Sequence, residues 1–444
     1  MDDADPEEPS ATTPALPDDL IVEEILVRLP PKVVLRFRAA CRAWRSDTST
    51  PMFLRSNYDH QVPLPLVFFS NCTKDPDTLD AIDVLAAAGA EYRRTLLAFG
   101  CGTLHASYEG LLLISHENAR YTIYNPATRQ GVSLAELTSA RYALLYSSRS
   151  SDGGVECRIL FCKGRPAMYH VLTVGSSAPP RRIHLPQGPK DFTKLMAAGY
   201  PSFQSPSIQF NGALHWLMGK SLVVFDKVVE SFRSMRCPSA LLDARLFEID
   251  GTFGMSVRGA RDTAVSVWVL QDYQAEAWTL RYSIDLAMVD RLRVKYDSRH
   301  MLLSNDGHLL VSSGAGSTTL ILCDAQGTLI KDFSVNSWNP KVTGLSYKES
   351  IVRHSFFESK GKRRRPQASL FKRLRKGNPN FLLHTYPYDL GARFSTISHA
   401  VGFGRNCFIL VLSILELWSR NDILRDAISF PYISIYLKLQ KSGN

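Results

Sequence analysis

Apolar residues recur at two different spacings along the chain. From residue 16 to residue 57 they follow a helical period, as in Ile21, Ile25 and Leu29. From about residue 62 to residue 358 they form short runs between turn residues, for instance 111–115 and 265–270, which is typical of β-strands. The pattern predicts an α+β multidomain chain in which three short helices precede a long all-β region.

Prolines and polar residues mark the ends of the three expected helices. Asp18 or Asp19 can cap the first helix, and Pro30 ends it. Pro31 suits the start of the second helix, because the first position of a helix needs no amide hydrogen. The third helix continues through residue 44 and ends in the break at 47–51.

The helical segment carries a surplus of apolar side chains. Its 42 residues, from 16 to 57, fall below the size at which chains usually fold without a metal, disulfides or a partner. Burying one large apolar side chain stabilises a protein by about 1.5 to 3 kcal/mol, and three short helices cannot enclose all of those present. We therefore expect a partner surface to cover some of them. The alternative is a subdomain that packs only against its own chain.

The all-β region has a repeat of about fifty residues. Polar or glycine turn residues follow apolar strands at intervals of 50, 50, 51, 46 and 52 residues, namely Asp75, Asn125, Gly175, Asp226, Asp272 and Asp324. This period is typical of kelch-type propeller blades, which have four strands each. The six positions predict a kelch-like propeller of about six blades. An irregular β-sandwich is the alternative.

The positive charge is confined to one segment. The formal net charge is +10, but residues 359–376 hold nine basic and no acidic side chains, which leaves +1 for the other residues. The body of the protein is therefore close to neutral, and a nucleic-acid partner is not expected. We interpret the segment as an exposed linker, with a nuclear-import arm as the alternative. That arm would comprise Lys362, Arg363, Arg364, Arg365, Lys372, Arg373, Arg375 and Lys376.

No catalytic or metal-binding motif is recognisable in the sequence. It contains no HExxH, phosphate-loop or GxSxG pattern. The eight cysteines are scattered, and the closest pair, Cys157 and Cys162, has no matching pair elsewhere. We interpret His215 as a structural residue. We expect no catalytic residue, metal or cofactor.

The two ends of the chain complete the predicted organisation. Residues 1–15 carry five acidic and no basic side chains and lack an apolar run, so we expect a disordered tail and no secretory signal. Scattered cysteines also favour a reducing compartment, cytoplasmic or nuclear. A basic linker at 359–380 precedes an irregular extension at 381–444. Its apolar run is nine residues long, and about twenty are needed to span a bilayer, so no membrane anchor is expected.

The helical segment resembles an F-box throughout its length. The sequence ALPDDLIVEEILVRLPPKVVLRFRAACRAWRSDTSTPMFLRS has the family's motifs at the family's spacings, although Ala40 stands where a larger aliphatic residue is usual. The resemblance implies docking on a Skp-type adaptor and, through it, on a cullin. It also implies which residues form the adaptor face or its supporting core: Leu16, Pro17, Leu20, Ile25, Leu26, Leu29, Pro30, Val34, Leu35, Cys41 and Trp44.

The region that follows resembles the kelch-like F-box-associated domains of plant F-box proteins. The matching segments include YTIYNPATRQ, NGALHWLMGKSLVVFDKVVESFRSMRCP and VSVWVLQDYQAEAWTLRYSIDL. The resemblance implies that this domain holds a protein substrate, but it does not identify the residues that bind it. Trp216, Phe225, Trp268, Trp278 and Tyr282 are expected to fill the interfaces between sheets.

The expected function is that of a substrate receptor in a ubiquitin ligase of the Skp–cullin–F-box type, with no catalysis of its own. Two other classes stay open. One is a propeller enzyme or carbohydrate-binding protein that carries the helices for regulation. The other is a nucleic-acid-associated factor that acts through residues 359–376.

Overall fold

The computed structural model describes the helices and most of the β region. Its described residues are 20–40, 42–71, 77–86, 92–98, 102–116, 120–149, 155–185, 190–198, 206–219, 221–238, 244–258, 264–286, 299–312, 318–334 and 338–358. The chain divides into two compact units, Val22–Leu374 and Met1–Ile21 with Arg375–Asn444. Apart from residues 20 and 21, all described residues belong to the former. The predicted tail, basic linker and C-terminal extension lie outside the described residues.

Short helices precede the sheets, and together they form what we call the helical module, residues 22–61. They are η1 (Ile21–Ile25), η2 (Leu26–Arg28), α2 (Pro31–Ala40), α3 (Arg42–Asp47) and α4 (Pro51–His60). The prediction of three helices was incomplete, because α4 begins inside the expected break. The Thr50 side chain accepts a hydrogen bond from Phe53 N at 3.2 Å, and Pro51 occupies the first turn. Both features favour a helix start.

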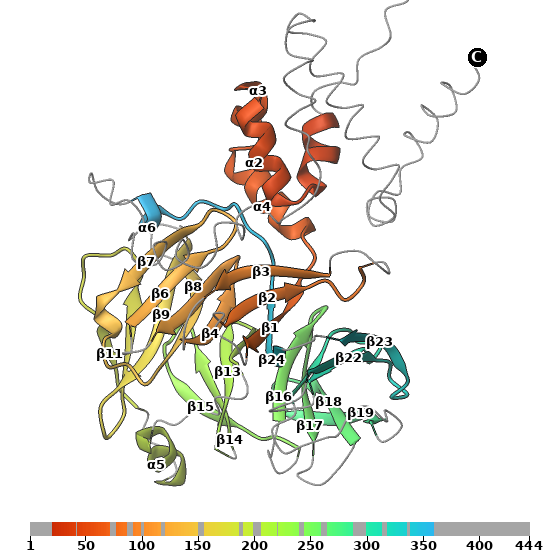
Figure 1. The fold of residues 1–444 in the computed structure, drawn as a ribbon. Coiled ribbons are helices and arrows are strands. Elements are labelled where there is room, and N and C mark those ends of the chain that lie inside the picture. Colours follow the sequence, from red (N-terminus) through yellow and green to blue (C-terminus); the bar gives the residue numbers. More distant parts are fainter. Residues whose placement is uncertain are drawn as a thin grey trace, which may run out of the picture. The chain divides into compact units, whose positions relative to one another are not determined.

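The described residues of the β region form six four-stranded antiparallel sheets, which we name blades A to F (Figure 1). Blade A contains β1 (Leu64–Asn71), β2 (Thr78–Ile82), β3 (Arg93–Ala98) and β24 (Trp338–Tyr347). Blade B contains β4 (Gly102–Tyr108), β5 (Leu111–His116), β6 (Arg120–Asn125) and β7 (Gln130–Leu134). Blade C contains β8 (Tyr142–Arg149), β9 (Val155–Lys163), β10 (Met168–Thr173) and β11 (Arg181–Ile183).

The remaining blades follow the same plan. Blade D contains β12 (Ile208–Phe210), β13 (Ala213–Met218), β14 (Ser221–Asp226) and β15 (Phe232–Met235). Blade E contains β16 (Ala244–Ile249), β17 (Thr252–Arg258), β18 (Ala264–Asp272) and β19 (Ala277–Asp285). Blade F contains β20 (Arg299–Leu302), β21 (Leu309–Ser312), β22 (Thr319–Cys323) and β23 (Leu329–Ser334). Short helices η3 (Ala135–Leu137), α5 (Lys190–Ala198) and α6 (Ser355–Glu358) lie outside the sheets.

The blades close into a ring. The first strands of successive blades lie beside one another: β4 with β8, β12 with β16, β16 with β20, and β20 with β24. Strand β24 pairs antiparallel with β1, with Leu64 opposite Tyr347 and Phe69 opposite Pro340, so blade A contains strands from both ends of the β region. The predicted six-bladed propeller is confirmed, and the β-sandwich alternative is wrong.

The fifty-residue repeat corresponds to one turn that recurs between the third and fourth strands of a blade. Asn125, Asp226 and Asp272 each accept hydrogen bonds from two backbone amides within the turn, at 2.8 to 3.2 Å. Asp324 does so in blade F. Side chains of Asn and Asp stabilise such turns by replacing backbone acceptors. The repeat is therefore a repeat of local turn chemistry.

Two of the predicted turn positions differ from this pattern. Gly175 occupies the turn of blade C with a positive φ of 84°, which suits glycine. Asp75 lies outside the described residues, and the equivalent residue of blade A is Asp83. This residue follows β2 and accepts a hydrogen bond from Leu85 N at 3.0 Å.

A separate apolar cluster fills each of the six interfaces between neighbouring blades. The cluster between blades C and D contains Trp216 and Phe225. Trp268 and Trp278 pack against the cluster between blades D and E, and Tyr282 packs between blades E and F. The expected role of these five aromatic residues is confirmed.

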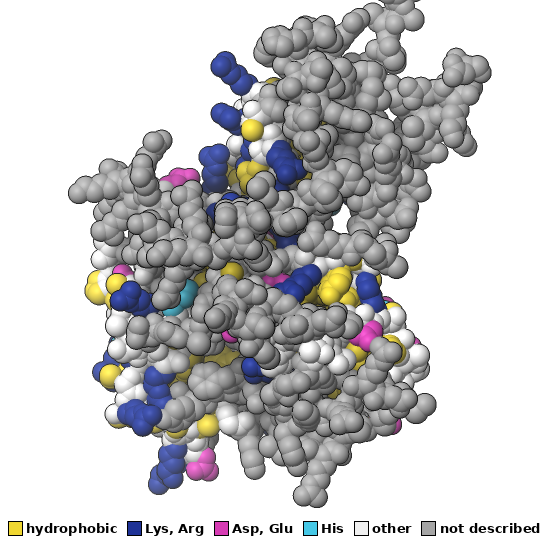
Figure 2. Space-filling model, viewed as in Figure 1, with side chains coloured by type: hydrophobic (Ala, Val, Ile, Leu, Met, Phe, Trp, Pro, Cys, Tyr) yellow, Lys and Arg dark blue, Asp and Glu magenta, His cyan; other side chains and the backbone are white. Residues whose placement is uncertain are grey.

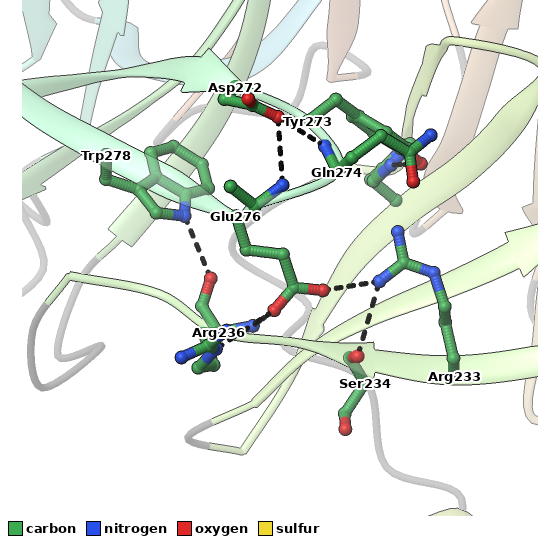
Figure 3. Close-up of polar contacts among 10 residues, drawn as sticks. Arg233, Ser234, Arg236, Asp272, Tyr273, Gln274, Glu276 and Trp278 are labelled. Atoms are coloured by element: carbon green, nitrogen blue, oxygen red, sulfur yellow. Dashed lines mark hydrogen bonds and ion pairs between the residues drawn. The ribbon is translucent and has the colours of Figure 1, made fainter.

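The carboxylate of Glu276, at the end of a turn, forms bonds that join blades D and E (Figure 3). Glu276 has a φ of 54° at the last position of the β18–β19 turn. Its carboxylate lies 2.6 Å from Arg233 Nη1 and accepts a hydrogen bond from Arg236 N at 2.9 Å. Trp278 Nε1 donates to Arg236 O at 2.8 Å. The turn of one blade is thereby bonded to the outer strand of the preceding blade.

Blades C and D are joined in the same way. Glu230 ends the β14–β15 turn with a φ of 51°. Its carboxylate pairs with Arg158 on β9 at 3.4 Å and with Arg181 on β11. A charged side chain at the last position of this turn can therefore form ion pairs with the preceding blade.

After β24 the chain crosses the turns of blades B and C. Asn125 Nδ2 donates to Ser350 O at 3.1 Å. Gly110 lies so close that a Cβ atom there would be 2.1 Å from the Cβ of Ser350. Phe356 belongs to the cluster between blades B and C. We call residues 348–358 the strap.

Candidate functional site

The structure places the predicted adaptor-binding residues in three different environments. Leu16, Pro17 and Cys41 lie outside the described residues. The buried ones are Leu26, Leu29, Val34 and Trp44. Ile25 and Leu35 are half-buried, and Leu20 and Pro30 are exposed. The prediction therefore mixed residues that form a core with residues that solvent reaches.

The core of the helical module is built from all its helices. Phe37 on α2 and Trp44 on α3 pack edge to face with ring centroids 5.4 Å apart. Phe53 and Leu54 add buried side chains from α4, which packs against η2. Val27, which was not among the predicted residues, is also buried. These contacts define a scaffold that holds the partly exposed Ile25 and Leu35 in place.

The side chain of Asn57 joins α4 to the end of η2. Its Nδ2 donates to Val27 O at 2.8 Å and to Leu29 O at 2.9 Å, and the residue is fully buried. The last carbonyls of a helix lack hydrogen-bond donors within that helix, and here the Asn57 amide is the donor. Sequence reasoning missed this residue. The available signal was a lone polar side chain three and four positions after Leu54 and Phe53, on the apolar side of α4.

Arg38 fixes the turn after α3. Its Nε donates to Thr48 Oγ1 at 2.9 Å, and its Nη2 bonds to Thr48 O. Burial and the nearby charge of Arg353 lower the pKa of Arg38 to about 10, so it stays charged at neutral pH. The guanidinium contributes to the fold of the module.

Polar contacts attach α4 to the propeller. Arg55 Nη1 lies 2.7 Å from the Glu109 carboxylate in the β4–β5 turn. Lys348 Nζ donates to Asp59 O at 3.1 Å and lies 4.8 Å from the centre of the Tyr58 ring. Burial raises the pKa of Tyr58, so its hydroxyl is neutral. These contacts connect the helical module to blade B and to the strap.

The histidine and the two cysteines that were considered as candidate catalytic or metal-binding residues are buried or half-buried in the propeller. His215 is fully buried, and its Nε2 lies 2.9 Å from Tyr273 Oη. Burial lowers the pKa of His215 to about 4, so it is neutral at physiological pH. Burial raises the pKa of Cys157 to about 12 and of Cys162 to about 11. The two cysteines pack against different clusters, and the described residues contain no group of three His, Cys, Asp or Glu that could hold a metal ion.

Two further predictions concern the last part of the chain. The basic residues proposed as a nuclear-import arm, from Lys362 to Lys376, lie outside the described residues. The apolar run at 407–415 lies outside them as well. Within the described part of the chain, no helix has the length and apolar character that crossing a membrane requires.

Comparison with known families and solved structures yields only distant similarity. No protein-family model matches the chain. Apo AztD of Citrobacter koseri is 11% identical, with a TM-score of 0.36, over 65% of this chain and 100% of its own. Hsv2 of Kluyveromyces lactis is 12% identical, with a TM-score of 0.32, over 53% of this chain and 64% of its own. Similarities this low support no conclusion about the chain.

Comparison with curated sequences reveals similarity over more than half of the chain. F-box protein At5g07610 of Arabidopsis thaliana is 22% identical over 363 residues, which cover 70% of this chain and 82% of that protein. F-box protein At5g49610 of the same plant is 24% identical over 305 residues, which cover 62% and 80%. Two more F-box proteins of this plant match to a similar extent. The N-terminal motif and this similarity over 60% to 70% of the chain support a plant F-box protein.

Proposed function

We propose that this F-box protein is the substrate-receptor subunit of a ubiquitin ligase of the Skp–cullin–F-box type. In this proposal the F-box, residues 16–57, docks on a Skp-type adaptor and through it on a cullin. The propeller, residues 62–358, acts as a kelch-like F-box-associated domain and binds a protein target. The complex works in the cytoplasm, the nucleus or both, and other subunits transfer ubiquitin.

The observation that carries the proposal is the way in which the helical module is attached. The helices of the module share one core, and the contacts of Arg55 and Lys348 bond α4 to the propeller. A receptor that connects two partners is more effective when the connection is short and stiff, because this raises the effective concentration of the target. The attachment of α4 supports a function of this kind.

Adaptor capture by purified full-length protein tests the proposal. Leu20→Asp and Leu35→Asp, made singly, place a charge on partly exposed apolar positions of the predicted face. We expect each to weaken capture of a Skp-type adaptor by about tenfold or more, because interface positions in the centre of a contact contribute most of the affinity. The matched control is Met52→Asp, at a position that is 79% exposed on α4 and is not part of the predicted face.

Because only a folded variant can test binding, the melting temperature of each variant is first compared with that of the unaltered protein. Capture that is equal for both variants and the control would show that the predicted face does not bind the adaptor. Failure of the unaltered chain to capture any Skp-type adaptor would contradict the receptor function itself.

A second experiment distinguishes a receptor from a propeller enzyme or carbohydrate-binding protein. Proximity labelling is performed with the full chain and with a chain that lacks residues 16–57. If the propeller selects a target for degradation, one or a few proteins accumulate near the shortened chain. If labelling is the same for both chains, the propeller acts without the ligase.

A further inference from the structure

Three basic side chains lie together on one face of blade C. In the sheet, His170 on β10 is directly opposite Arg182 on β11 and Phe161 on β9, and directly opposite residues share a face, with Cβ atoms about 5 Å apart. Lys163 is two residues after Phe161 on β9, so the alternation along a strand places it on the same face. We call Lys163, His170 and Arg182 the basic face of blade C. It is turned toward blade B, because Phe161 belongs to the apolar cluster between these two blades.

The buried ring of Phe161 holds two of these side chains in place. Lys163 Nζ lies 5.3 Å from the centre of the ring, and the imidazole of His170 stacks on it with centroids 5.3 Å apart and an angle of 20° between the planes. Lys163 Nζ also donates a hydrogen bond to the backbone oxygen of Glu136 at 2.5 Å. Lys163 and His170 are half-buried, and Arg182 is exposed. Because two of the three groups are already ordered, they lose little side-chain entropy when a ligand binds.

The opposite face of the same strands is also basic, but there glutamates neutralise the charge. Arg158 on β9 pairs with Glu156 at 2.9 Å and with Glu230 at 3.4 Å, and Arg181 on β11 pairs with Glu230 as well. The face turned toward blade B differs, because among the described residues of β8 to β11 it carries no acidic side chain. The sheet therefore balances the positive charge on one of its faces and not on the other.

The basic face holds two positive charges and one neutral ring. No ion pair between described residues includes Lys163 or Arg182. Burial lowers the pKa of His170, and the charges of Lys163 and Arg182 lower it further, so its imidazole is neutral at physiological pH and can donate a hydrogen bond. Glu136, the acidic residue that contacts Lys163, does so through its backbone oxygen. These three side chains can therefore bind an anion from outside the blade.

We propose that the basic face of blade C binds a short acidic segment of a partner protein. A carboxylate can accept two parallel hydrogen bonds from the guanidinium of Arg182, and the ammonium of Lys163 attracts another carboxylate as a point charge. His170 lies on the strand between them, so its imidazole can donate to the same segment. The proposal concerns blade C alone, and it depends neither on adaptor binding nor on the function of the helical module.

A nucleic acid fits this surface less well than an acidic peptide. Single strands bind proteins largely by stacking their bases on aromatic side chains, but Phe161 is only 1% exposed, and its ring contacts Lys163 and His170. Figure 2 shows Lys and Arg side chains along the edge of the propeller where Figure 1 places β9, β11 and α5, interrupted by hydrophobic and other side chains. A phosphate backbone binds best to an extended positive surface, and the formal charge of the chain outside residues 359–376 is only +1.

Binding of a fluorescent peptide of alternating Glu and Ser to the full-length protein tests the proposal. The double variant Lys163→Glu and Arg182→Glu reverses both charges of the basic face. The matched control, Lys190→Glu and Lys194→Glu, reverses two exposed charges on α5 and changes the net charge equally. Arg182→Glu alone is a second test variant, because Arg182 is exposed and its replacement keeps the contacts of Phe161 with Lys163. The melting temperature of each variant shows whether it is folded.

We expect the double variant to weaken peptide binding on the order of tenfold and Arg182→Glu alone about threefold, because each exposed charge pair is weak and reversal adds repulsion. The α5 control should bind as the unaltered protein does. In about 1 M salt, where the screening length falls to about 3 Å, the difference should disappear. Protein labelled at histidine gives a local readout. The NMR signal of His170, assigned from its absence in His170→Gln, should shift when the peptide is added, whereas that of the exposed His60 on α4 should not.

Several results would overturn the proposal. One is the absence of saturable binding, and another is an equal loss in the double variant and the α5 control. A third is unchanged binding by folded Arg182→Glu. A fourth is photo-crosslinking of the peptide to residues 359–376 alone, without products on β9 to β11. A fifth is tighter binding of a single-stranded oligonucleotide that is lost in the double variant, because this would assign the surface to nucleic acid. None of these results depends on adaptor capture.

Discussion

The amide of Asn57 offers a direct test of how the helical module is held together. Asn57→Leu keeps a side chain of similar size but removes both donors, so the carbonyls of Val27 and Leu29 lose bonds of 2.8 and 2.9 Å. A buried acceptor left without its partner costs about 1 to 3 kcal/mol. Gln61 Nε2 also donates to Leu29 O, at 3.2 Å, and retains part of one interaction. We expect the module to lose about 2 to 4 kcal/mol of stability.

Native-state hydrogen exchange followed by mass spectrometry measures this loss locally. Amides of α2 and α4 should exchange about 30- to 700-fold faster in the variant, which corresponds to the expected change in free energy. Peptides from blades C to E act as an internal reference and should not change. Ser56→Ala, next to Asn57 on α4, is the control for altering this helix without removing the amide.

Two results would contradict this reasoning. If exchange in α2 and α4 rises by less than about threefold, the amide does not hold the module together. If the reference peptides accelerate as much as the helices do, the module and the propeller unfold as one unit, and the measured loss belongs to the whole protein.

Three further predictions concern the propeller. The pKa of His215 is about 4 in the folded protein and 6.5 as a reference value, so the unfolded chain binds the proton more readily. The free energy of unfolding, measured by urea denaturation, should therefore fall on the order of 3 kcal/mol as the pH drops from 6.5 to 4. His215→Asn should make the free energy of unfolding depend less steeply on pH. Burial opposes ionisation of Glu276, but its bonds to Arg236 and Arg233 lower its pKa overall from 4.5. Its contribution, about 1 kcal/mol, is therefore present above that pH and lost below it, and Glu276→Gln should melt lower than the unaltered protein at neutral pH but not in acid. Gly110→Ala should destabilise by about 2 kcal/mol or more, because the new Cβ would lie 2.1 Å from the Cβ of Ser350; Gly251→Ala, also at positive φ but with nothing within 4 Å, is the control in the same melting experiment.

The propeller was predictable from sequence because its blades repeat a local signal. An Asn or Asp side chain that accepts hydrogen bonds from two amides of its own turn recurs about every fifty residues, as Asn125 and Asp226 do. In blade A the predicted position, Asp75, lies outside the described residues, and the equivalent turn residue, Asp83, is 42 residues before Asn125 and so departs from the fifty-residue interval. The strand β24 of this blade comes from the far end of the region. Pairing between distant strands leaves no periodic trace in the sequence.

The site was less predictable, because an apolar stripe on a short helix does not separate core from surface. Leu26 and Val34 are buried, whereas Leu20 is 48% exposed, yet all three fit the same family pattern. The Thr50–Pro51 step looks like a break but starts α4. The bonds of Asn57 to the carbonyls of Val27 and Leu29 join residues that are 30 and 28 positions apart, so the fold had to be known before they could be recognised.

The pairing of β1 with β24 has a consequence for synthesis of the protein. The ribosome completes the helical module almost three hundred residues before it reaches Tyr347, the partner of Leu64. Until then blade A lacks one strand, and the apolar faces that border it, including Val67 and Phe69, have no cover from Val342. Nascent chains therefore present a finished N-terminal module on an open ring, a stage at which chaperones are needed and early partners can already bind.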